Sequence, residues 1–175
     1  MRSRLSAAVI AVCAVTGVVW AQGAKPTDPQ IAHIAYTAGQ IDITQAEQAL
    51  KMSKNKDVLA FANNMVKDHT AVNKQALDLC KKLGVTPEDN DTSKSLKKAG
   101  DEKLADLAKL SGAAYDKAYI DNEVAYHKTV NGAVSTVLIP SATNAELKAL
   151  LETGLKIFQG HQAHAEQLAS KMMGQ

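Results

Sequence analysis

Apolar residues recur with helical spacing along four long segments of this chain, and none of these segments alternates as a strand does. Residues three and four positions apart lie on one face of a helix, so each segment predicts an amphipathic helix that buries one stripe. The predicted helices span residues 28–52, 56–83, 112–138 and 142–172. Helices of this kind bury their stripes against one another, so we predict an all-α protein.

The connections between these segments limit how the helices can be joined. The first and last connections are short, which favours antiparallel neighbours. Between the second and third helices lie a polar, proline-bearing loop and a lysine-rich stretch, residues 92–110, which is interrupted at Gly100. We expect one or two short helices there, forming a crossover. One crossover is typical of ferritin-like folds, so residues 28–175 are predicted to form a ferritin-like four-helix bundle with a short helical crossover between helices 2 and 3.

The N-terminal residues have the features of an export signal. Arg2 and Arg4 precede an apolar run from Leu5 to Trp20, and Ala21 closes a sequence suited to cleavage. We therefore predict a secretory signal peptide at residues 1–21, a linker at 22–27 and a periplasmic location. The apolar run is short for a bilayer, so no stable membrane span is expected after cleavage.

Removal of residues 1–21 would change the charge and cysteine content of the chain. Both arginines lie in that segment, and the remainder carries 18 lysines against 18 acidic residues. A neutral chain without arginine lacks the basic surface that nucleic acids require, so no nucleic-acid partner is expected. The one remaining cysteine, Cys80, falls on an apolar stripe and is predicted to be buried and inert. A homodimer linked through Cys80 is the alternative.

Three histidines occupy positions where the helical pattern calls for apolar, core-facing residues, one in each of the last three predicted helices. They lie about thirteen to nineteen residues from the helix starts, as does Asp42 in the first helix, so antiparallel packing brings them to similar heights. Glu123 shares a helical face with His127, four residues away. Imidazole is the commonest metal ligand in proteins. The predicted ligands of a metal ion are His69, His127, His161, Glu123 and Asp42.

Four further residues are expected to lie beside these ligands and support them: Asp116, Tyr119, Met65 and His164. Asp68 is about 100° around the helix from His69, so we expect it at the surface. A buried histidine can also simply pair with a neighbouring carboxylate or carbonyl. The alternative to a metal site is therefore a buried hydrogen-bond network that specifies how the helices pack.

The types of predicted ligand restrict the metal. Di-iron bundle sites use Glu-x-x-His pairs, and the sequence has no such pair, because Glu123 precedes His127 by four residues. A single zinc, copper or iron ion suits imidazoles with carboxylates, and Met65 would favour copper. The chain has no nucleophile–base motif and no phosphate-binding loop. An enzyme is therefore the less favoured function, although a metal ion with an open position could support chemistry.

Two stretches resemble a known family of exported bacterial proteins. Phe61-Ala62, Met65-Val66 and Asp68-His69 resemble the FAxxMVxDH stretch of the DUF4142 family, and residues 111–119 resemble its LSGxxFDxxY stretch. The resemblance covers about residues 28–170. It implies a ferritin-like fold and export, and no established activity. We predict an exported metal-binding bundle for storage, buffering or stress response. The alternative is an interaction module of the cell envelope that binds a protein partner.

Overall fold

The structure is a computed structural model that describes residues 25–174, so the predicted signal peptide and residues 22–24 of the predicted linker lie outside it. The described residues form helices and no strand, which confirms the all-α class. A further finding is that no helix in this part of the chain is long and apolar enough to cross a membrane. The elements are α1 (Asp28–Met52), α2 (Lys56–Leu83), α3 (Asp91–Leu107), α4 (Gly112–Ala133), a π-helical turn η1 (Val134–Leu138), α5 (Ile139–Ser141) and α6 (Ala145–Met173).

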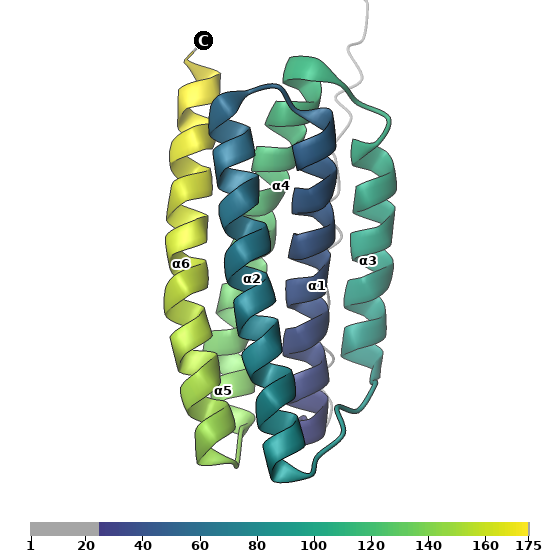
Figure 1. Ribbon diagram of the computed structural model, residues 1–175, viewed down its shortest axis with the longest axis vertical. Coiled ribbons are helices and arrows are strands. Elements are labelled where there is room, and N and C mark those ends of the chain that lie inside the picture. The colour runs from purple at the N-terminus through teal and green to yellow at the C-terminus, as the bar shows by residue number, and fades with distance from the viewer. Residues whose placement is uncertain (1–24, 175) are drawn as a thin grey trace, which may run out of the picture.

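The long helices α1, α2, α4 and α6 run side by side around a common interior (Figure 1). Helix α1 packs against α2 and α4, and α6 packs against the same two helices. Helix α3 lies on the outer side of α1 and carries the chain from one end of the molecule to the other (Figure 1). Because of this return, α2 and α4 run in the same direction, and both are antiparallel to α1 and α6 (Figure 1).

Polar caps define the ends of these helices. Asn55 accepts hydrogen bonds from backbone amides in the first turn of α2, and Asn144 does the same for α6. These caps satisfy N–H groups that have no partner within the helix. Gly84 ends α2 with φ of 65°, the left-handed conformation that glycine adopts without strain. The bounds of α1 and α2 agree with the predicted helices.

The start of α1 has a cap of its own. Thr27 is the N-cap, and its reciprocal bonding with Gln30 forms a capping box. Asp28 accepts hydrogen bonds from Thr143 and Asn144, so it fastens the start of α1 to the start of α6.

The crossover is one continuous helix, because Gly100 lies inside α3 and does not interrupt it. A β-carbon at Gly100 would lie 2.8 Å from a side-chain carbon of Ile41, so this glycine permits close packing of α3 on α1. The predicted helix 112–138 ends as regular α-helix at Ala133 and continues as the π-helical turn η1 and α5. The predicted start at residue 142 moves to Ala145, where Asn144 caps α6.

A polar layer divides the core. One apolar cluster includes Phe61 and Tyr119, and a second, towards the other end of the helices, includes Ile34 and Leu138. The four long helices carry five buried polar residues at positions between these two clusters. They are Asp42, His69, Glu123, His127 and His161. Cys80 is also buried and free, as predicted, and burial raises the pKa of its thiol.

Candidate metal centre

The three core histidines form a nearly equilateral group, although each comes from a different helix. The ring centroids of His69 and His127 are 5.7 Å apart, those of His69 and His161 are 5.3 Å apart, and those of His127 and His161 are 5.7 Å apart. Each ring offers one nitrogen to the group, and these three nitrogens all lie within 4.8 Å of one another. Two nitrogens that share one ion lie about 3–4 Å apart, since each metal–nitrogen bond measures about 2 Å. Small side-chain adjustments would therefore bring the three onto one ion.

His127 also belongs to a second group, which contains the carboxylates of Asp42 and Glu123 within the same 4.8 Å limit. Oδ2 of Asp42 lies 3.5 Å from Nε2 of His69. Nδ1 of His127 lies 3.1 Å from the carbonyl oxygen of Glu123 and 3.4 Å from its Oε2. A carbonyl oxygen only accepts, so Nδ1 carries hydrogen, and Nε2 has a lone pair for the cluster only once His127 gives up its second proton.

Many polar atoms of the cluster have no hydrogen-bond partner among the described residues. They are Oδ1 of Asp42, both ring nitrogens of His69, both carboxylate oxygens of Glu123, Nε2 of His127 and Nδ1 of His161. A buried polar atom without a partner costs about 1–3 kcal/mol. A cation would turn several of these lone pairs into ligand bonds, so the atoms present fit a transition-metal ion.

The burial and mutual proximity of these groups change their affinity for protons. Burial lowers the pKa of His69 well below its ordinary value, and the nearby imidazoles of His127 and His161 lower it further. Burial raises the pKa of Asp42. Burial alone would lower the pKa of His127, but the carboxylates of Asp42 and Glu123 outweigh it and raise that pKa to about 9. Without a metal ion, His127 therefore holds the cluster's imidazolium proton at neutral pH.

Asp68, which we expected at the surface, is partly exposed and also contacts the cluster. Its side chain is 34% exposed, and its Oδ2 lies 3.0 Å from Nε2 of His161. Burial lowers the pKa of His161, and the hydrogen bond to Asp68 opposes that shift. The sequence holds no direct sign of this contact, because Asp68 lies on α2 and His161 on α6. The helical angle correctly places Asp68 beside the buried stripe but does not reveal what α6 offers there.

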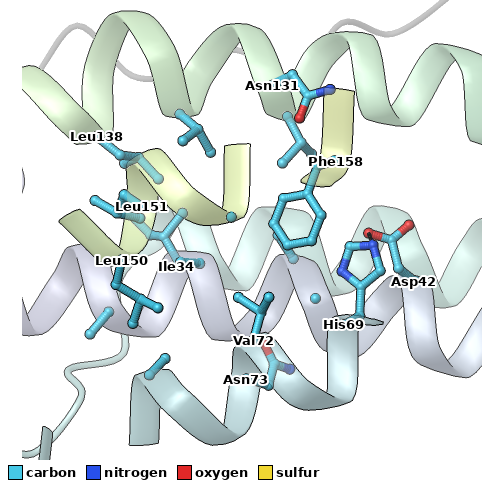
Figure 2. Close-up of a pocket in the computed structure, with 18 of the residues that line it drawn as sticks. Ile34, Asp42, His69, Val72, Asn73, Asn131, Leu138, Leu150, Leu151 and Phe158 are labelled. Atoms are coloured by element: carbon cyan, nitrogen blue, oxygen red, sulfur yellow. Dashed lines mark ion pairs between the residues drawn. The ribbon is translucent and has the colours of Figure 1, made fainter. Parts of the chain in front are cut away.

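A narrow apolar cavity of about 50 Å³ adjoins the cluster and is lined in part by Asp42, His69 and His127. Figure 2 shows His69 and Phe158 at one end of it and Leu138 and Leu151 at the other. The rings of Phe158 and His69 are stacked, with centroids 4.3 Å apart and an angle of 2° between the planes. The π-helical turn contributes Val134 and Leu138 to the wall. Apolar side chains therefore border the cluster on this side.

The four residues expected to support the ligands lie around or within the apolar cluster that contains Phe61. Tyr119 and Met65 are fully buried members of it, and Tyr119 meets Phe61 edge to face at 6.2 Å. His164 is half-buried, and its ring meets Phe61 at 5.3 Å. Asp116 is buried on α4. Asp116 and His164 are in neither group of close ligand atoms, and the supporting roles of all four residues stay predictions.

Comparison with known proteins identifies the family. The profile of "Domain of unknown function (DUF4142)" matches residues 15–168, so the chain belongs to this family. A solved structure described as "CopM in the Cu(II)-bound form" is similar, with a TM-score of 0.64 and 15% sequence identity. The match covers 84% of this chain and 98% of that one. At this identity the likeness establishes the fold alone. A search of curated proteins found no match.

Proposed function

We propose that this protein binds one transition-metal ion in the polar layer of its core, through His69, His127, His161 and Asp42. Glu123 fixes the ring of His127 and is available as a further ligand. The observation that carries the proposal is the convergence of three imidazole nitrogens within 4.8 Å of one another, in a buried setting that leaves them few other partners. An accidental histidine in a core makes a hydrogen bond to a carbonyl or carboxylate. His69 lies 3.5 Å from Oδ2 of Asp42, but neither of its ring nitrogens makes a hydrogen bond within residues 25–174.

The ligand types favour copper or zinc. Three imidazoles with one carboxylate suit both ions, and a single iron ion is the remaining candidate. The similar structure was described in a Cu(II)-bound form, which supports copper. Copper is also consistent with the neighbouring Met65, although this thioether lies in the apolar cluster.

The biological role that we propose is metal storage, buffering or stress protection outside the cytoplasm. Its support is the export signal predicted in residues 1–21, which lie outside the described residues. The fold that we propose is a ferritin-like four-helix bundle. Its support is the single crossover α3, which makes α2 and α4 parallel, because ferritin-like folds have one such connection (Figure 1).

Elemental analysis of the untagged, natively exported protein tests metal binding directly. We expect about one equivalent of a single transition metal in the wild type and its loss in His69→Ala. His33→Ala is the matched control, because His33 lies on α1 beside Asp89 and outside the cluster. Circular dichroism must show that both variants keep their helices.

Mixed, substoichiometric metals that His69→Ala leaves unchanged would overturn the metal site. That result would favour the alternative, in which the cluster is a buried hydrogen-bond network of a partner-binding module. In that case His69→Ala should change the free energy of unfolding and leave the metal content as it was.

A further inference from the structure

We propose that Asp68 is a positioning residue: its carboxylate selects the tautomer of His161 that offers Nδ1 to the metal ion. This inference deepens the proposed function and rests on it. It assigns a role to a partly exposed carboxylate that does not face the ion itself. It also makes α2 supply both a ligand, His69, and the neighbouring group that orients a ligand on α6.

The geometry separates the two nitrogens of His161. Nε2 lies 3.0 Å from Oδ2 of Asp68, and Nδ1 is buried without a hydrogen-bond partner in the described part of the chain. The His161 side chain is 10% exposed and that of Asp68 is 34% exposed. The contact therefore lies at the edge of the polar layer, where the cluster comes nearest to solvent.

The chemistry of the pair follows from what each group can donate. An ionised carboxylate only accepts hydrogen bonds, so Nε2 of His161 must carry the hydrogen. In a neutral imidazole the other nitrogen, Nδ1, then has a free lone pair. Metal-binding histidines commonly donate their second N–H to a carboxylate in this way, which fixes the tautomer, orients the ring and increases its basicity.

The other aspartates of α2 contrast with Asp68. Asp57 pairs with Lys171 and Asp78 pairs with Lys74, both across exposed surface. Exposed pairs of that kind contribute little to stability. Among the ion pairs of residues 25–174, the partner of Asp68 is His161 alone. The carboxylate of Asp68 therefore pairs with a residue of the cluster and not with a surface lysine.

The tautomer itself is the first measurement, and it needs no metal. Nitrogen-15 NMR of histidine-labelled, metal-free protein at pH 8 should show His161 with hydrogen on Nε2 and a bare Nδ1. In Asp68→Ala this preference should weaken to a mixture, and in Asp68→Asn it should persist, since the amide oxygen still accepts. Hydrogen on Nδ1 in the wild type overturns the proposal whether or not the protein binds metal.

Affinity is the second measurement. Competition with a chromophoric chelator for Cu(II) or Zn(II) should show affinity lower by about 10–100-fold in Asp68→Ala, the usual effect of removing such a group. Asp68→Asn should recover most of the loss, and Asp78→Ala, the matched control on α2, should bind as the wild type does. Equal affinity of Asp68→Ala and wild type overturns the positioning role. If the wild type binds no metal, the proposed function fails instead, and the NMR result alone decides whether Asp68 sets the tautomer.

Discussion

Metal binding at this centre should depend steeply on pH, because the ion must replace the proton of His127. The folded pKa of His127 is about 9, against an ordinary value of 6.5. That difference corresponds to about 3 kcal/mol in favour of the imidazolium within the fold. Because pH 7 is two units below the pKa of His127, the imidazole is almost fully protonated there. The apparent affinity for the metal ion should therefore be about 100-fold below its value at high pH. It should rise about tenfold per pH unit between pH 7 and 9 and then level off.

Isothermal titration calorimetry with a competing chelator, at pH 6 to 10 and in buffers of different ionisation enthalpy, measures both affinity and proton release. We expect at least one proton released per ion at pH 7. Glu123→Gln is the informative variant, because removing this carboxylate lowers the pKa of His127 and should end the rise at lower pH. An affinity that stays constant from pH 7 to 9, with stoichiometric binding, would refute the reasoning.

The same shift has a consequence for the stability of the metal-free protein. The folded pKa of His127 lies above its unfolded value, so the imidazolium contributes stability that is fully present below pH 6.5. This contribution should disappear as pH rises through 9. Metal-free protein should therefore lose up to about 3 kcal/mol of unfolding free energy between pH 6.5 and 9, and His127→Gln should remove that dependence.

Three further predictions concern the scaffold, and urea denaturation tests each of them. Gly100→Ala should destabilise the protein by about 1–2 kcal/mol because the new methyl group overlaps Ile41, whereas Gly132→Ala, with open space around it, should stabilise by up to about 1 kcal/mol. Equal effects would contradict close packing at Gly100. Asn144→Ala should cost about 1 kcal/mol by uncapping α6, and no loss would mean that water replaces the cap. Tyr119→Phe should cost little, because the hydroxyl has no hydrogen-bond partner within residues 25–174, and a loss above about 1 kcal/mol would reveal one.

Local rules predicted most of the fold. The 3.6-residue spacing predicts the bounds of α1 and α2 almost to the residue, because this signal acts within one or two turns. The π-helical turn at residues 134–138 was not predictable in this way. Residues 134–138 carry no signal specific to a π-helix, although Pro140, which cannot donate a helical hydrogen bond, follows the turn closely. Gly100 was misread for the same reason: a glycine that breaks a helix and one that admits a neighbouring helix are identical in sequence.

In the candidate site, too, some features could be predicted from local sequence patterns and others could not. Residues on the buried stripes of separate helices could be expected to meet, since the helices have similar lengths and these residues lie near their midpoints. The contact between Asp68 and His161 could not, because it depends on the rotation of α2 and α6 relative to each other. Ligand candidates thus follow from periodicity within one helix. The groups that orient these ligands depend on how the helices pack against one another, and no local pattern in a single sequence predicts that packing.

The polar layer should reduce the stability of the metal-free fold, and this separates a binding site from a structural network. Replacing a buried charged pair by apolar residues often stabilises a protein by about 1–4 kcal/mol, whereas removing one partner destabilises it. His127→Leu should therefore lower the unfolding free energy in chelator-treated protein, because it leaves Glu123 buried without its partner. The double variant Glu123→Leu/His127→Leu should exceed the wild type in stability and bind no metal. If the double variant is less stable than the single one, the layer is itself a cooperative hydrogen-bond network that holds the helices in register. If the double variant is more stable than the wild type, Glu123 and His127 reduce the stability of the metal-free protein. Ligand binding then explains why the protein has these side chains.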